Sequence, residues 1–158
     1  MTDFSYTQDF VELNKRYPDA YLANWSAAEY WGIIDELSRR VILFSPKTEG
    51  QGKLGNMSFY IKKVPQTMCF DIQKIDEDDG EFFYVSSPAK TMVDCFLYPE
   101  LAGGERQTDY IFSMYYESPL YDQAHLLTIA KKLLPPEKIS HILKLIQELK
   151  NDWSKNID

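Results

Sequence analysis

The stretch EFFYVSSPAKTMVDCFL (residues 81–97) decides the fold class of this chain. Residues 82–85 are aromatic or β-branched, a composition that favours a strand. Ser87 followed by Pro88 is typical of a helix start, because serine caps the first turn and proline fits its first position. The apolar side chains that follow recur at helical spacing in one stripe, made of Ala89, Met92, Val93, Phe96 and Leu97. We therefore predict a strand that passes directly into an amphipathic helix.

Further strand patterns precede this stretch. Residues 41–44 form a compact apolar run that ends before Pro46, as expected of a buried strand. Apolar and polar residues alternate over 57–62 and again over 68–73, which is the period of a strand with one face on the core. These runs predict several short strands close together in the chain.

Two connecting segments separate the strands. Residues 76–80 contain Asp79-Gly80, a good turn signal for a hairpin that leads into the strand at 81–85. Residues 47–55 contain three glycines and predict an exposed loop. The strands should therefore form an antiparallel meander.

Helical patterns stand on both sides of the strands. Ser5 and Gln8 form a capping box for a first helix, which Tyr17-Pro18 should end. Asp19 is expected to cap a second helix that ends near Gly32. Further helices are expected at 105–116, at 121–134 and from 135 onward. Because helices and strands segregate along the chain, we predict an α+β fold, a small, mainly antiparallel sheet flanked by N-terminal and C-terminal helices, rather than a doubly wound sheet.

The composition fits one globular domain over residues 1–158. The chain is 44% hydrophobic and 26% charged, which excludes collagen-like and wholly disordered classes. The start has no basic region followed by an apolar run, and nowhere do about 18 uncharged apolar residues run together. We expect a cytoplasmic protein with no membrane-spanning segment.

The net charge of −7 bears on the choice of partner. An acidic surface repels phosphates and opposes the electrostatic term that supplies most nucleic-acid affinity. The densest basic candidates are the pairs Arg39-Arg40 and Lys62-Lys63. Direct nucleic-acid binding by this chain alone is therefore not expected, whereas a basic protein partner would suit it.

Few residues are candidates for catalysis or metal binding. His125 and His141 belong to no metal-binding pair on one helical turn, and structural roles are expected for both. Cys69 and Cys95 are too few and too far apart for a zinc site or a disulfide framework, and a buried thiol is expected at Cys95. We therefore expect no catalytic, cofactor-binding or metal site.

The acidic run at 76–79 has two interpretations. Its four carboxylates, Asp76, Glu77, Asp78 and Asp79, could chelate a hard cation. Calcium loops, however, space their ligands alternately and close with a distal glutamate, so a solvated hairpin tip is favoured.

Two other charged pairs leave alternatives open. Asp71 and Lys74 approach the site of a metal-dependent nuclease, which needs a second acidic residue two positions before the lysine. Lys90 and Asp94 lie one helical turn apart on the face opposite the apolar stripe, with Thr91 alongside, so they can pair. By itself this pattern is typical of a surface ion pair.

Three stretches together resemble the C-terminal domain of the AbiEi family, the antitoxins of type IV toxin-antitoxin systems used in bacterial abortive infection. The first is AYLANWSAAEYWG (residues 20–32), and the second is the strand region 40–85. The third and most specific is VSSPAKTMVDC (residues 85–95), followed by Pro99 and Gly103-Gly104. The resemblance covers about residues 18–150, and residues 1–17 are a helical extension before it.

The resemblance implies a non-enzymatic antitoxin that counteracts a nucleotidyltransferase-type toxin in phage defence. The family usually also represses its own operon through an N-terminal winged helix. Only about 19 residues precede the matching helix here, too few for a winged helix. Two alternatives stand beside the antitoxin: a transcriptional regulator acting through DNA or a DNA-binding partner, and a small metal-dependent nuclease.

The motif positions that match the family are Ser26, Lys90, Thr91 and Asp94. Two roles are open for them: stitching the fold by satisfying backbone groups, or contacting a protein partner. The acidic tip at 76–79 is the other candidate contact, because it would meet a basic partner.

Overall fold

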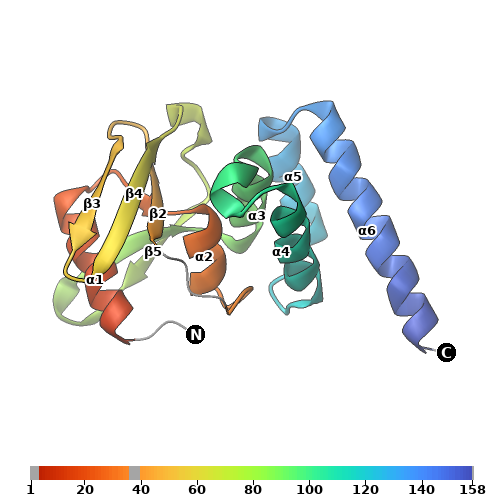
Figure 1. The fold of residues 1–158 in the computed structure, drawn as a ribbon, viewed down its shortest axis with the longest axis horizontal. Coiled ribbons are helices and arrows are strands. Elements are labelled where there is room, and N and C mark those ends of the chain that lie inside the picture. Colours follow the sequence, from red (N-terminus) through yellow and green to blue (C-terminus); the bar gives the residue numbers. More distant parts are fainter. Residues whose placement is uncertain (1–3, 36–39, 158) are drawn as a thin grey trace.

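The structure is a computed structural model that describes residues 4–35 and 40–157. Figure 1 shows two halves: a twisted sheet with two helices beside it, and a group of helices at the other end. The helices are α1 (Phe4–Arg16), α2 (Asn24–Tyr30), α3 (Pro88–Leu97), α4 (Glu105–Glu117), α5 (Gln123–Leu133) and α6 (Pro136–Ile157). Short 3-10 turns add η1 (Gln66–Met68), η2 (Asp78–Gly80) and η3 (Pro99–Ala102). We call α1, α2 and the strands the sheet half, and α3–α6 the helical half.

The sheet has the order β3-β4-β2-β1-β6-β5. Its strands are β1 (Tyr21–Leu22), β2 (Val41–Ser45), β3 (Gly50–Leu54), β4 (Met57–Lys63), β5 (Ile72–Asp76) and β6 (Phe82–Ser86). Within the described residues, β3/β4, β1/β2 and β5/β6 pair antiparallel, while β2/β4 and β1/β6 pair parallel. The prediction of an α+β fold with flanking helices is confirmed, and the sheet is mixed rather than a simple meander.

Each face of the sheet has its own apolar cluster. On one face, Phe10, Val11 and Leu13 of α1 pack on alternate residues of the central strands, such as Phe59 and Ile61. On the other face, a second cluster contains Tyr21, Ile42, Phe44, Val64 and Met68. Side chains of η1 and η3 pack on this cluster. Because strand side chains alternate in direction, two clusters on opposite faces are expected of this pattern.

The helical half has a third cluster, in which α3 is central. Residues 89–96 of α3 are buried on every side of the helix. Its neighbours are α2 from the sheet half and α4 and α5 from the helical half. Figure 1 places α3 between the sheet and the other helices, so this helix joins the two halves.

The predicted loop at 47–55 is wrong over its second part. Residues 50–54 form the edge strand β3, which pairs with β4 across a turn at Gly55 (φ +61°). A Cβ at Gly52 would lie 2.9 Å from the Phe59 ring. The glycine therefore lets the strand approach an aromatic side chain, a use of glycine that composition alone cannot separate from a flexible loop.

The predicted second helix begins later than expected. Tyr21 and Leu22 form strand β1, buried between β2 and β6, and α2 begins at Asn24. Asn24 has φ +56°, and its Oδ1 accepts a hydrogen bond from the Trp25 N–H at 2.8 Å. Asp19 therefore does not cap this helix. Burial on both faces of the sheet outweighs the helical pattern at Tyr21 and Leu22.

The strand predicted at 68–73 is also shifted. Met68 lies in η1, and β5 covers 72–76 and leads into the hairpin with β6. The turn at Asp79-Gly80 is confirmed, since both residues have positive φ. The predicted helix start is confirmed as well, because Ser87 Oγ accepts from the Lys90 N–H at 3.2 Å.

Candidate functional site

Lys90 and Asp94 form an ion pair inside the protein. Lys90 Nζ lies 2.9 Å from each Asp94 carboxylate oxygen, and neither side chain has any exposed surface. The predicted pairing is confirmed, but its predicted place on the surface is wrong. The physical reason is that α3 is packed on all sides, so the face opposite its apolar stripe is also buried.

Two aromatic rings stand over the Lys90 ammonium. Nζ lies 5.6 Å from the centre of the Tyr21 ring and 5.5 Å from that of Phe70. Burial raises the pKa of Asp94 to about 6, against the opposing effect of the Lys90 charge. Burial also raises the pKa of Tyr21, and the charge of Asp94 adds to this rise. The pair is therefore held in a buried site with aromatic walls.

The other two motif residues, Ser26 and Thr91, form hydrogen bonds with backbone groups near the place where the two halves meet. Ser26 Oγ accepts from the Ile42 N–H at 2.8 Å, which joins α2 to β2. Thr91 Oγ1 lies 2.7 Å from Ser86 Oγ and donates to the Ser86 carbonyl at 3.3 Å. Ser26 and Thr91 are buried. These contacts join β6 to α3 and α2 to the sheet.

Asn24 completes this buried group and was not singled out by the sequence. Its Nδ2 donates to the carbonyls of Asp94 and Tyr98, both at 3.3 Å. It has no exposed surface. We call Asn24, Ser26, Lys90, Thr91 and Asp94 the polar joint. Asparagine is one of the few residues that tolerate positive φ, but nothing in a single sequence marks position 24 as such a place.

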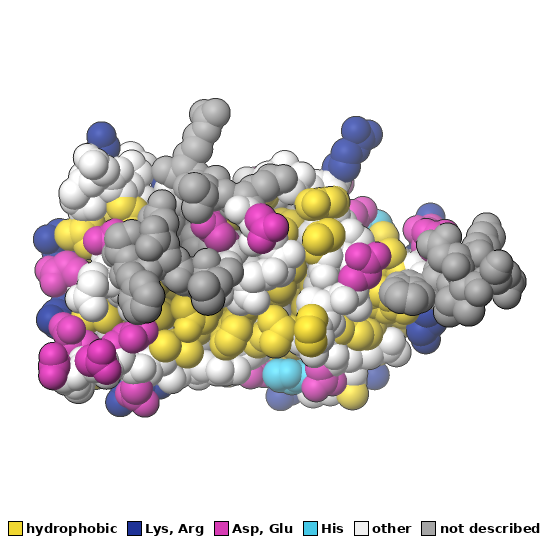
Figure 2. Space-filling view, turned by 90° about the horizontal axis from the view of Figure 1, so that it is seen from below, with side chains coloured by type: hydrophobic (Ala, Val, Ile, Leu, Met, Phe, Trp, Pro, Cys, Tyr) yellow, Lys and Arg dark blue, Asp and Glu magenta, His cyan; other side chains and the backbone are white. Residues whose placement is uncertain are grey.

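The acidic candidates lie apart from the polar joint, at the tip of the β5–β6 hairpin. Asp76, Asp78 and Asp79 are exposed, and Glu77 is half-buried. Figure 2 shows acidic side chains gathered at the sheet end of the molecule, at the lower left of that view. We call residues 76–81 the acidic hairpin. Backbone hydrogen bonds close it, from Glu77 N–H to the Glu81 carbonyl at 2.7 Å and from Glu81 N–H to the Asp78 carbonyl at 3.2 Å.

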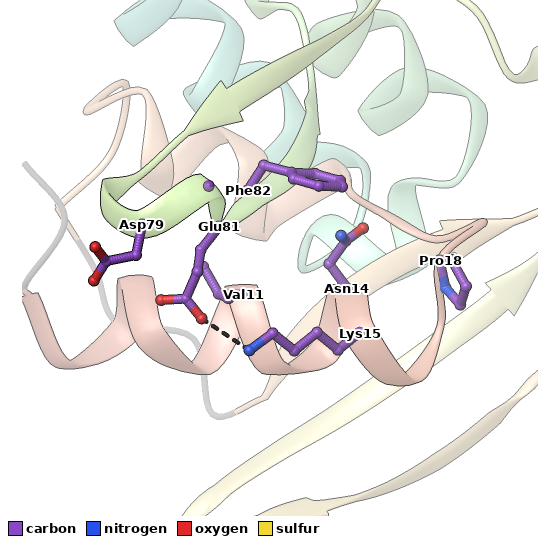
Figure 3. Close-up of a pocket in the computed structure, with 8 residues that line it drawn as sticks. Val11, Asn14, Lys15, Pro18, Asp79, Glu81 and Phe82 are labelled. Atoms are coloured by element: carbon purple, nitrogen blue, oxygen red, sulfur yellow. Dashed lines mark hydrogen bonds and ion pairs between the residues drawn. The ribbon is translucent and has the colours of Figure 1, made fainter.

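An open hollow lies between the acidic hairpin and α1. It has a volume of about 640 Å³, and Val11, Asn14, Lys15, Pro18, Asp79, Gly80, Glu81 and Phe82 line it. Figure 3 shows Lys15 reaching along α1 to Glu81, with Nζ and Oε2 2.8 Å apart. This ion pair ties the hairpin to the helix, so the exposed aspartates stand on a supported turn.

Both histidines pair with an aspartate and join separate elements. His125 Nε2 of α5 contacts Asp71 Oδ2, just before β5. His141 Nε2 of α6 lies 2.8 Å from Asp109 Oδ1 of α4. These pairs match the structural roles predicted for the histidines, and Asp71 is therefore engaged by His125.

Asp71 and Lys74, on which the nuclease alternative depends, each pair with a different residue. Lys74 Nζ is 3.6 Å from Asp76 Oδ1 and half-exposed, while Asp71 faces α5. Within residues 4–35 and 40–157, no group of three His, Cys, Asp or Glu side chains is placed to hold a metal ion. Cys95 is buried as predicted, and burial raises the pKa of its thiol.

No protein-family model matches the chain, and no curated protein matches it either. In the part of the chain that the structure describes, no helix combines the length and apolar character needed to cross a bilayer. The molecule is thus an α+β domain with a buried polar joint and an exposed acidic hairpin.

Proposed function

We propose that this chain is a non-enzymatic antitoxin that binds a nucleotidyltransferase-type toxin in the bacterial cytoplasm and lowers its activity during phage defence. The resemblance of residues 20–32, 40–85 and 85–95 to the AbiEi family supports the class of partner. The observation that carries the proposal is the acidic hairpin, because it offers a partner a supported group of exposed carboxylates.

The charge of the hairpin suits such a toxin. An enzyme that handles nucleotides presents cationic groups around its substrate site, because phosphates must be held there. Asp76, Asp78 and Asp79 are all exposed on a turn that Lys15 and Glu81 tie to α1. Complementary charge speeds encounter and fixes the orientation of two partners. We therefore assign the toxin contact to the acidic hairpin.

The motif residues have a different role in this proposal. Lys90, Thr91 and Asp94 have no exposed surface, so they cannot touch a partner docked on this conformation. Their contacts hold β6 and α3 together, and α3 joins the two halves. We assign the polar joint to the fold, and binding to the surface of the sheet half.

The test is coexpression with the product of the neighbouring reading frame, in a host where that product alone is toxic. We expect this chain to restore growth and to co-purify with the toxin. The variant Asp76→Asn/Asp78→Asn/Asp79→Asn should lose much of both effects. A matched control, Glu117→Gln/Glu137→Gln/Glu148→Gln, removes the same charge from exposed helical positions and should behave as the wild type.

The outcomes separate the parts of the proposal. Growth without a complex would replace direct binding with opposition at the toxin's target. A complex that both variants form equally would remove the contact from the acidic hairpin. Toxicity that this chain does not relieve would overturn the antitoxin function itself.

A further inference from the structure

The face of the sheet opposite α1, part of which η1 and η3 cover, carries cationic side chains from neighbouring strands. Phe59 and Ile61 of β4 point to α1, so Ser58, Tyr60 and Lys62 point to the other face. Lys53 of β3 pairs directly with Ser58. The β2/β4 register, Val41 opposite Phe59, places Arg40 beside Ser58 on the other side. We call Arg40, Lys53, Tyr60 and Lys62 the cationic face.

The register gives the spacing of these charges. Arg40 and Lys53 flank β4 at one level, which separates their backbones by two strand spacings, about 10 Å. Lys62 lies four residues along β4 from Ser58, about 13 Å away. Three cations thus mark the corners of a patch that spans three strands.

Aromatic rings lie among these cations. The Arg40 guanidinium stands 4.8 Å from the centre of the Tyr60 ring, and Lys62 Nζ stands 4.7 Å from that of Tyr98. Arg40 and Lys53 are exposed, and Tyr60 and Lys62 are half-exposed. A guanidinium plane supported by a tyrosine can itself stack on a base. The nearby Glu49 carboxylate accepts the Lys63 backbone N–H at 3.3 Å.

We propose that the cationic face binds single-stranded nucleic acid. Backbone phosphates would meet Arg40, Lys53 and Lys62, while bases lie against the Arg40–Tyr60 pair. A sheet face with cations and aromatic rings is the kind of surface on which an unpaired strand can lay both its phosphates and its bases. The net charge of −7 limits the affinity, but a local patch of three cations offsets it where the strand lies. This surface is separate from the acidic hairpin and does not depend on the antitoxin function.

The test is fluorescence polarisation with labelled oligothymidylate and oligouridylate at low salt, followed by a salt titration. Both single strands should bind, with a slope of log affinity against log salt of about −2, because three phosphate contacts are made. A duplex of the same length should bind more weakly. The variant Arg40→Gln/Lys53→Gln/Lys62→Gln should lose at least about tenfold in affinity.

The matched control is Arg106→Gln/Lys131→Gln/Lys144→Gln, which removes three exposed cations from α4, α5 and α6. It should bind as the wild type does. Equal loss in both variants, tighter binding of duplex, or no binding by the wild type at low salt would overturn the proposal. Lys53→Gln alone, at an exposed edge position, keeps the comparison valid if the triple variant is less stable, and it should still weaken binding.

Discussion

Replacement of Lys90 by methionine leaves the Asp94 carboxylate buried without its counter-ion. Lys90 Nζ lies 2.9 Å from both carboxylate oxygens, and both side chains are fully buried. Breaking a buried pair by removing one partner costs about 3–5 kcal/mol, whereas an exposed pair one helical turn apart contributes about 0.3–0.5 kcal/mol. We expect Lys90→Met to lower the free energy of unfolding by about 3–5 kcal/mol.

The measurement is urea unfolding followed by circular dichroism, with Lys90→Met/Asp94→Leu as the second variant. Removing both charges leaves no unpaired ion, so the double variant should recover most of the loss. A loss of less than about 1 kcal/mol in Lys90→Met would refute the reasoning, because it is the value of an exposed pair. A double variant as unstable as the single one would show that the cost comes from packing instead.

Three further predictions concern the same region. Ser26→Ala leaves the buried Ile42 N–H without its acceptor and should cost about 1–3 kcal/mol in urea unfolding. Ser87→Ala removes the cap that accepts from the Lys90 N–H and should cost about 1 kcal/mol, with a lower melting temperature. The raised pKa of Asp94, about 6, means that the native state keeps this proton to higher pH than the unfolded chain does. The stabilising contribution of this carboxyl should therefore be present at about pH 4 and be lost as the pH rises through about 6. Over that range the wild type should lose stability relative to Lys90→Met/Asp94→Leu in urea unfolding. A gain in relative stability with rising pH would contradict the raised pKa of Asp94.

The regular elements were predictable where one local signal dominates. Ser87 and Pro88 marked the start of α3 because a cap and a restricted φ act over one turn. The hairpin at Asp79-Gly80 was predictable for a similar reason, since both residues take positive φ. The amphipathic patterns of α1, α4, α5 and α6 gave those helices with ends shifted by a few residues.

Features that depend on distant packing were not predictable in this way. Gly52 looks like a loop residue until the Phe59 ring is placed against it. Tyr21 and Leu22 look helical until β2 and β6 stand on either side of them. Lys90 and Asp94 were paired correctly by their spacing, but their burial depends on helices that pack on the polar side of α3. Local spacing fixes which side chains meet, and only tertiary packing decides which are buried.

The acidic hairpin and the cationic face differ in the same way, because one follows from a local pattern and the other from tertiary packing. The acidic hairpin was predictable as an exposed tip, because a run of carboxylates next to a turn cannot be buried without counter-charges. The cationic face was predictable only in part: Arg40 and Lys62 belong to the basic pairs of the sequence, but they meet Lys53 only through the pairing of β2, β3 and β4. Net charge alone hides such a patch.

The most direct measurement of the central claim is the association rate of the purified chain with the purified toxin at several salt concentrations. Binding through the acidic hairpin predicts a rate that falls with added salt, and a slower rate at low salt for Asp76→Asn/Asp78→Asn/Asp79→Asn. The control Glu117→Gln/Glu137→Gln/Glu148→Gln should associate at the wild-type rate. Equal rates for all three proteins at every salt concentration would contradict the account.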